Sequence, residues 1–176
     1  MNLIASAYRL GLRFTGRSAW ARAAACHNPM RDLEADLRRR YSGVLAIEPT
    51  SLSDACLLFD VREAAEFEVS RLAGAIRVSP RSRAAEVIAA VPCDRLAGAT
   101  AVFYCAVGVR SARLVNRLQP DLLAVGVAGI ASLSGGIFRW HNEGRPLVDA
   151  KGRANRVHPY NAHWRQFLLD RTAGGA

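Results

Sequence analysis

A single cysteine, Cys105, stands between an apolar segment and an amphipathic one, and this arrangement constrains the fold more than any other feature of the chain. Residues 101–103 are Ala-Val-Phe, a β-prone run that is typical of a buried strand. From Ser111 onward, apolar residues recur at helical spacing. The residues between these segments form a short loop that contains Gly108. The sequence therefore predicts a strand that ends at a cysteine, followed by a loop and the first turn of a helix.

The predicted loop places Cys105 where negative charge is stabilised. Free backbone amides at the start of a helix point outward, and the helix dipole there favours anions. Successive amides that face one centre form an anion-binding nest. A thiolate held in such a nest is charged and nucleophilic at neutral pH, and Arg110 adds a permanent cation at the far end of the loop. The alternative is that Cys105 only packs, since cysteine is among the most often buried residue types.

Three stretches of the chain, in the expected order, resemble the signatures of rhodanese-like sulfurtransferases. They are the active-site pattern Cys-x-x-Gly-x-Arg-Ser at residues 105–111, the first signature at 57–63 with 66–67 and 74–76, and the last signature at 133–137 with Trp140 and 143–146. The resemblance covers about residues 43–148. One position departs from the pattern, because Arg71 stands where the family usually carries a histidine.

The resemblance implies an α/β fold in which a mainly parallel sheet is flanked by helices on both faces, and the alternation of predicted strands and helices favours the same fold. It also implies that Cys105 is the catalytic residue. The residues that it assigns to substrate binding are Ala106, Val107, Gly108, Val109, Arg110 and Ser111. Asp60 falls where a predicted strand ends, and by resemblance Asp60 and Arg62 lie near the loop as supporting residues. From the residues alone, we expect Arg62 to pair with Glu66 on the following helix.

The function that the resemblance implies is sulfur transfer through a persulfide on Cys105. The thiolate takes sulfane sulfur from thiosulfate or a persulfide donor and passes it to a thiol or cyanide acceptor. No metal or organic cofactor is expected, and the four cysteines show no metal-ligand spacing. Because Arg110 is the only cation in the loop, we expect weak turnover of thiosulfate, a dianion, and better turnover of a less charged persulfide.

Three other functions stay open from the sequence. The first is a non-catalytic rhodanese-like binding or regulatory module, against which the retained Cys105 argues. The second is a phosphatase of related fold, whose loop has one residue more between cysteine and arginine than the four found here, Ala106 to Val109. The third is an interaction protein that works through its N-terminal arm and its aromatic tail.

The chain divides into four expected segments. They are a basic N-terminal arm or targeting segment (1–27), a leading helix (28–42), the rhodanese-like domain (43–148), and a linker with an aromatic C-terminal tail (149–176). The leading helix should be capped by Asn28. Pro120 should end the helix that follows the loop, and the polar residues 149–156 should form the linker. We expect the tail to dock through three aromatic residues, Tyr160, Trp164 and Phe167.

Composition and charge restrict the partners and the location of the protein. The formal charge is +9 in 176 residues, but the basic residues are scattered and show no aromatic-basic pattern of a nucleic-acid module. We therefore expect no nucleic acid partner. Cysteines without paired spacing favour reducing, cytoplasmic surroundings. Residues 1–27 carry four arginines and no acidic residue, so an organellar transit segment and an arm that contacts a membrane surface are the alternatives.

Overall fold

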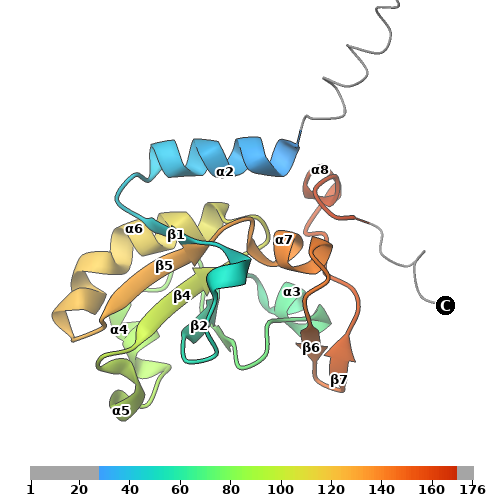
Figure 1. The fold of residues 1–176 in the computed structure, drawn as a ribbon. Helices are drawn as coiled ribbons and strands as arrows, with labels where there is room; N and C mark the ends of the chain where they lie inside the picture. Colours follow the sequence, from blue (N-terminus) through green and yellow to red (C-terminus); the bar gives the residue numbers. More distant parts are fainter. Residues whose placement is uncertain (1–27, 170–176) are drawn as a thin grey trace, which may run out of the picture.

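A five-stranded, wholly parallel sheet forms the centre of the molecule in a computed structural model, which describes residues 28–169 (Figure 1). The strands are β1 (Leu45–Ile47), β2 (Leu57–Asp60), β3 (Ile76–Arg77), β4 (Thr100–Tyr104) and β5 (Gly129–Leu133), in the order β1-β5-β4-β2-β3. Because β4 lies in the middle of the sheet, the next residue, Cys105, stands at the centre of its carboxyl edge. Open α/β sheets place their sites at this edge.

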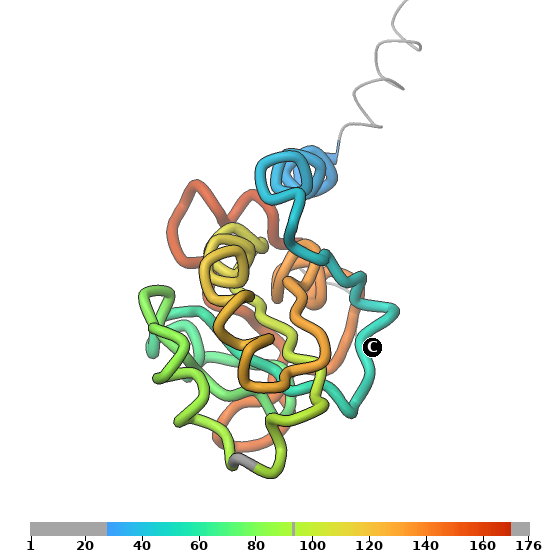
Figure 2. Tube along the Cα trace, turned by 90° about the vertical axis from the view of Figure 1, so that its left-hand side faces the viewer, coloured from blue at the N-terminus to red at the C-terminus, as the bar shows by residue number. Residues whose placement is uncertain are grey.

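Helices cover both faces of the sheet, as Figures 1 and 2 show, so the predicted fold class is confirmed. The helices are α2 (Pro29–Arg40), α3 (Ala64–Val69), α4 (Ala84–Ala89), α5 (Cys93–Leu96), α6 (Val109–Ala124), α7 (Gly136–Asn142) and α8 (Ala162–Arg165), with a short 3₁₀ helix at Pro49–Ser51. Helices α4 and α6 pack on one face, and α7 packs on the other. Of the described helices, none combines the length and the apolar character needed to span a bilayer.

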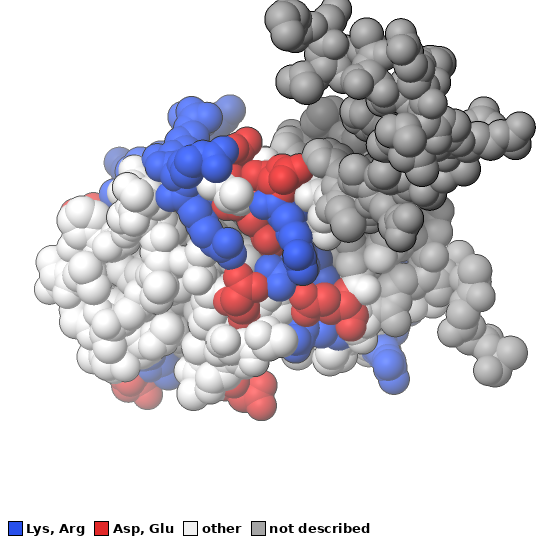
Figure 3. Space-filling model, turned by 45° about the horizontal axis from the view of Figure 1, so that its top comes forward, with Lys and Arg blue, Asp and Glu red and all other residues white. Residues whose placement is uncertain are grey.

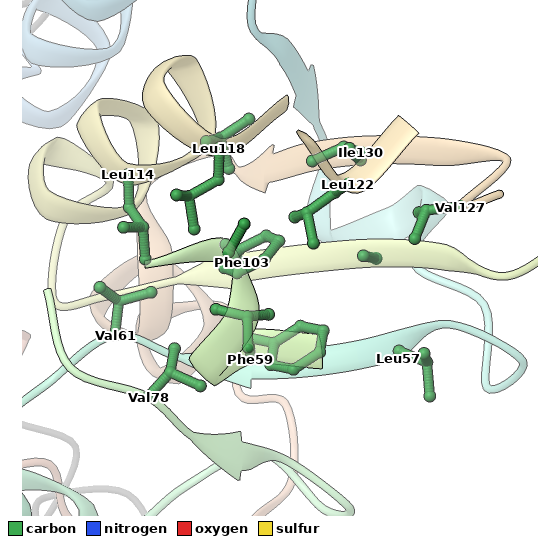
Figure 4. Packing of buried hydrophobic residues seen from close by; sticks show 14 of the residues in the cluster. Leu57, Phe59, Val61, Val78, Phe103, Leu114, Leu118, Leu122, Val127 and Ile130 are labelled. Atoms are coloured by element: carbon green, nitrogen blue, oxygen red, sulfur yellow. The ribbon is translucent and has the colours of Figure 1, made fainter. Parts of the chain in front are cut away.

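The core on the α6 face shows why the central strands are fixed in place. Side chains alternate along β4, so that Phe103 points toward α6 while its neighbours Val102 and Tyr104 point to the other face. The rings of Phe59 and Phe103 stack with centroids 4.7 Å apart, and Leu114 of α6 lies in the same cluster (Figure 4). Burying these large apolar side chains stabilises the fold, and it anchors the strand that carries Cys105.

The leading helix α2 has the predicted cap and lies next to β1 and α6 (Figure 1). The Asn28 side-chain oxygen accepts hydrogen bonds from the backbone amides of Met30 (3.0 Å) and Arg31 (3.3 Å), which satisfies two free donors. Leu37, one turn from the end of α2, reaches the loop that follows Cys105 and lines a small cavity beside Gly108. The helix therefore supports the site from outside the sheet.

Figure 3 shows basic and acidic side chains next to one another on the face that α2 covers. Arg139 contacts three carboxylates there, Glu34 at 3.0 Å, Glu48 at 2.6 Å and Glu143 at 2.9 Å. Arg38 also contacts Glu48, at 2.7 Å. The positive charges of Arg139 and Arg38 on this face are thus paired with carboxylates.

The structure contradicts the prediction that Pro120 ends the helix after the loop. Helix α6 continues through Pro120 to Ala124. A proline inside a helix removes one backbone hydrogen bond and crowds the preceding turn. Here Leu118 and Leu122, on either side of the proline, are both buried against the sheet, and this burial offsets the loss.

Residues after 146 also differ from the predicted linker. They form an antiparallel hairpin of β6 (Leu147–Asp149) and β7 (Gly152–Ala154). The Asp149 carboxylate accepts a hydrogen bond from the Lys151 amide at 2.7 Å and closes the turn. The aromatic tail then follows and includes α8, whose cap is Asn161. The arm, residues 1–27, lies outside the described residues.

Candidate active site

The loop after β4 holds the thiol of Cys105 against the first turn of α6. Gly108, the cap residue of α6, has φ +98°, a conformation that glycine adopts without a steric cost. In this conformation its amide donates a hydrogen bond to Cys105 Sγ at 3.2 Å. Ser111 Oγ lies 3.8 Å from the same sulfur and 2.9 Å from Ser132 Oγ. The amides of the first helical turn lack partners inside the helix, so this position suits an anionic group.

The start of α7 supports the loop from the other side of the sheet edge. The amide of Ile137 donates to the carbonyl oxygen of Cys105 at 2.9 Å, and that of Phe138 donates to the carbonyl oxygen of Ala106 at 3.0 Å. Gly136 makes this approach feasible, because a Cβ there would lie 2.4 Å from the Cys105 carbonyl oxygen. The Gly-Gly turn of the sequence therefore fixes the backbone that carries the thiol.

Arg110 pairs with Glu66, which lies 44 residues earlier at the first turn of α3. Two parallel hydrogen bonds join them, from Nη1 to Oε2 (2.7 Å) and from Nη2 to Oε1 (2.8 Å). The side chains are 22% and 2% exposed. Burial alone lowers the pKa of Arg110, but the hydrogen bond to Glu66 and the negative charges of Cys105 and Glu66 raise the pKa above its ordinary value. Burial opposes ionisation of Glu66, yet Arg110 lowers its pKa. The loop cation is thus already neutralised by a buried carboxylate.

The two supporting residues form a separate buried pair behind the loop. Arg62 donates from Nη2 to Asp60 Oδ2 at 2.6 Å and to the carbonyl oxygen of Ser70, also at 2.6 Å. Both side chains of the pair are fully buried. The expected pairing of Arg62 with Glu66 is wrong, because Asp60 takes Arg62 and Arg110 takes Glu66. Asp60 stands beside Tyr104 in the sheet. Because Tyr104 directly precedes Cys105, the Asp60–Arg62 pair lies near the loop, as the resemblance implies.

Two residues of the aromatic tail complete the site, and sequence reasoning did not place them there. A cavity of about 180 Å³ borders Cys105, and Tyr160 and Trp164 line it together with loop residues. The loop residues are Ala106, Val107, Val109 and Arg110. The expected docking is confirmed for Trp164 and Phe167, which are partly buried against the core, but not for Tyr160, which is 46% exposed. The position of Tyr160 and Trp164 beside the cavity depends on contacts across the fold, which no local pattern in the sequence reveals.

The chain belongs to the rhodanese-like domain family. The family model matches residues 48–143, which is more than half of the chain. The match contains the first predicted signature, Cys105 and the loop that follows it, and it ends at residue 143, within the last signature. A search of curated proteins found no match.

Several solved structures are similar to this chain. A rhodanese-related protein from Thermoplasma volcanium is 29% identical, with a TM-score of 0.46; the match covers 59% of this chain and 97% of that one. A thiosulfate sulfurtransferase from Pseudomonas aeruginosa is 18% identical, with a TM-score of 0.50; the match covers 79% of this chain and 26% of that one. A protein of unknown function from Rhodopseudomonas palustris, described as a possible tyrosine phosphatase, is 18% identical with a TM-score of 0.48, over 68% of this chain and 94% of that one.

The pairing of Arg110 with Glu66 predicts how substitutions at Arg110 behave. Arg110→Lys should lower the free energy of unfolding by about 1–2 kcal/mol, because lysine replaces a two-bond contact with a point charge. Arg110→Ala should cost about 3 kcal/mol, since it leaves the buried Glu66 carboxylate without its cation. The sulfur transfer that the resemblance implies should fall in the same order. Urea unfolding and transfer assays measure the two effects, and equal behaviour of the lysine variant and the wild type would contradict the prediction.

The acid limb of stability provides a second readout for the same pair. Because the pKa of Glu66 is lowered in the folded protein, the pair contributes fully above the ordinary carboxyl pKa of about 4.3. The contribution is lost as the pH falls further, through the folded-state pKa. In Arg110→Ala the main cause of the lowered pKa is gone, while the Glu63 amide hydrogen bond and the charge of Arg62 remain, so this part of the acid-induced loss should shrink.

Proposed function

We propose that this protein is a sulfurtransferase that carries sulfane sulfur on Cys105. The proposal rests on one observation, which is the thiol held by the Gly108 amide in the first turn of α6 with its sulfur bordering a small cavity. An anion-stabilising helix start favours both the thiolate and the persulfide that follows it. Membership of the rhodanese-like family supports the same chemistry.

The reaction has two balanced steps. In the first, the Cys105 thiolate attacks the outer sulfur of a donor R–S–SH, the sulfur–sulfur bond breaks, and R–S⁻ leaves with the electron pair. The product is a Cys105 persulfide, so atoms and charge balance. In the second step an acceptor thiolate attacks the outer sulfur, takes it, and leaves the Cys105 thiolate. The two covalent steps predict ping-pong kinetics.

We propose that the preferred donors carry less charge than thiosulfate. Of the described residues that line the cavity with Cys105, Arg110 alone is cationic, and Glu66 neutralises it. Two other arginines that could help an anion are engaged elsewhere. Arg62 is buried with Asp60, and the Arg71 guanidinium lies 4.7 Å from the ring centre of Phe67. A dianion therefore gains little from the site and loses hydration on entry.

Donor kinetics test this preference. The value of kcat/KM for a short alkyl persulfide should exceed that for thiosulfate by about tenfold or more, which corresponds to one lost charge-assisted contact. Cyanide serves as the common acceptor in both assays. A clear preference for thiosulfate would overturn the donor proposal, while leaving the persulfide on Cys105 intact.

Intact mass measurement tests the proposed function itself. After exposure to a donor and removal of excess reagent, the protein should gain the mass of one sulfur atom, and addition of cyanide should remove it. The non-catalytic binding module is the competing function. It predicts that no donor of either class leaves sulfur on the protein.

A further inference from the structure

The C-terminal aromatic tail is anchored to α7 by two hydrogen bonds to the side chain of Asn142. Asn142 Nδ2 donates to the carbonyl oxygen of Phe167 at 2.8 Å, and the Leu169 amide donates to Asn142 Oδ1 at 2.9 Å. At the other end of the tail, Val157 is buried in the core. Between these anchors the rings of Trp164 and Phe167 lie 5.6 Å apart. The tail is therefore part of the packed domain and keeps a defined position.

Tyr160 occupies an unusual backbone conformation on this tail. Its φ is +65°, and within residues 28–169 no other non-glycine residue has a positive φ. Such a conformation is unfavourable for a bulky side chain, by about 1 kcal/mol. It places the phenol ring 4.7 Å from the guanidinium carbon of Arg110, a contact that stabilises a cation. The strain is thus coupled to a contact at the loop that holds Cys105.

The resulting cavity is small and largely apolar. Its volume of about 180 Å³ lies below the range of about 300–1,000 Å³ typical of sites that enclose drug-sized ligands. Alanine and valine residues of the loop line it together with the two aromatic residues of the tail. Among the described residues that line it, Arg110 is the one cation, and Glu66 and the Tyr160 ring both contact it. A group that enters must be compact and gains mainly from apolar contact.

We propose that Tyr160 and Trp164 are specificity-determining residues. They restrict Cys105 to sulfur donors and acceptors whose sulfur is attached to a compact, uncharged organic group, such as a short alkyl persulfide. Bulkier donors, glutathione persulfide among them, are excluded by the two rings rather than by the loop. This inference rests on the proposed function, since it names the substrate class of the same thiol.

Substrate size is the first test of this proposal. In the wild type, kcat/KM for ethyl persulfide should exceed that for glutathione persulfide by about tenfold, the effect of one excluded contact. Tyr160→Ala and Trp164→Ala should each shrink this ratio by raising turnover of the larger donor. Leu169→Ala is the matched control, because it truncates a large side chain of the same tail that does not line the cavity. Its ratio should equal that of the wild type.

Thiol alkylation is a second test, which does not require sulfur transfer. Iodoacetamide, which is small and uncharged, should modify Cys105 faster than a bulky aryl maleimide does, relative to their rates with free cysteine. Trp164→Ala should raise the maleimide rate by about tenfold and the iodoacetamide rate by much less. The proposal would be overturned if neither Tyr160→Ala nor Trp164→Ala changed the ratio of kcat/KM between the two donors or the ratio of the two alkylation rates. If no persulfide formed but the alkylation pattern were as expected, the proposed function would be overturned, and the proposed role of Tyr160 and Trp164 would stand.

Discussion

Replacing Cys105 with serine is expected to reduce sulfur transfer below detection for every donor while leaving the fold in place. Serine has nearly the same shape, and its oxygen can accept the Gly108 amide hydrogen bond that now goes to Sγ at 3.2 Å. A hydroxyl is a far weaker nucleophile than a thiolate and cannot carry a sulfane sulfur atom. Intact mass should show no sulfur adduct on the variant after donor treatment, and its urea unfolding curve should stay close to that of the wild type.

Cys56 offers the matched control for this experiment. It is the other described cysteine that is free, it is partly buried, and it packs against the core cluster on the α7 side of the sheet. Cys56→Ser should therefore keep wild-type transfer and the same adduct mass. Persulfide turnover that survives in Cys105→Ser would place the chemistry on another residue and contradict the proposed mechanism.

The sequence predicted the thiol loop well because its determinants are local. A β-prone run, a cysteine, a glycine in a short loop and an amphipathic helix all fall within residues 100–124, and the structure builds β4 and α6 from them. The Gly-Gly turn at the start of α7 was also predictable, since paired glycines mark a tight turn. What the pattern could not give is the contact of Gly136 with the Cys105 carbonyl oxygen, which joins two loops that are distant in the sequence.

The errors lie where long-range packing decides the outcome. Glu66 has arginines available at two sequence distances, and the fold pairs it with Arg110, the more distant one. Local spacing favoured Arg62, which the Asp60 carboxylate instead holds inside the protein. Helix α6 continues through Pro120 for a similar reason, because the burial of neighbouring side chains outweighs the tendency of proline to end a helix. The position of Tyr160 over Arg110 depends on a positive φ, and a tyrosine in the sequence does not predict a positive φ.

The support that α7 gives to the thiol loop leads to the second large effect, which is expected for Gly136→Ala. The added Cβ would lie 2.4 Å from the carbonyl oxygen of Cys105 and 2.6 Å from that of Ala106. Both contacts are to backbone, so relief requires displacement of the loop that carries the thiol. The residue also has φ +54°, which adds a cost of about 1 kcal/mol for any side chain. The free energy of unfolding should fall by about 3 kcal/mol or more, and sulfur transfer should fall with it.

Gly98→Ala separates the two causes of this loss. Gly98 has φ +73°, but a Cβ there meets nothing within 4 Å, so this variant carries the backbone cost alone, about 1 kcal/mol. It lies before β4, at the opposite edge of the sheet from Cys105, and should keep full transfer. Urea unfolding of the two variants and the wild type, with transfer measured on the same samples, gives the comparison. If Gly136→Ala were no less stable than Gly98→Ala, the close approach of α7 would not be what holds the Cys105 loop in place.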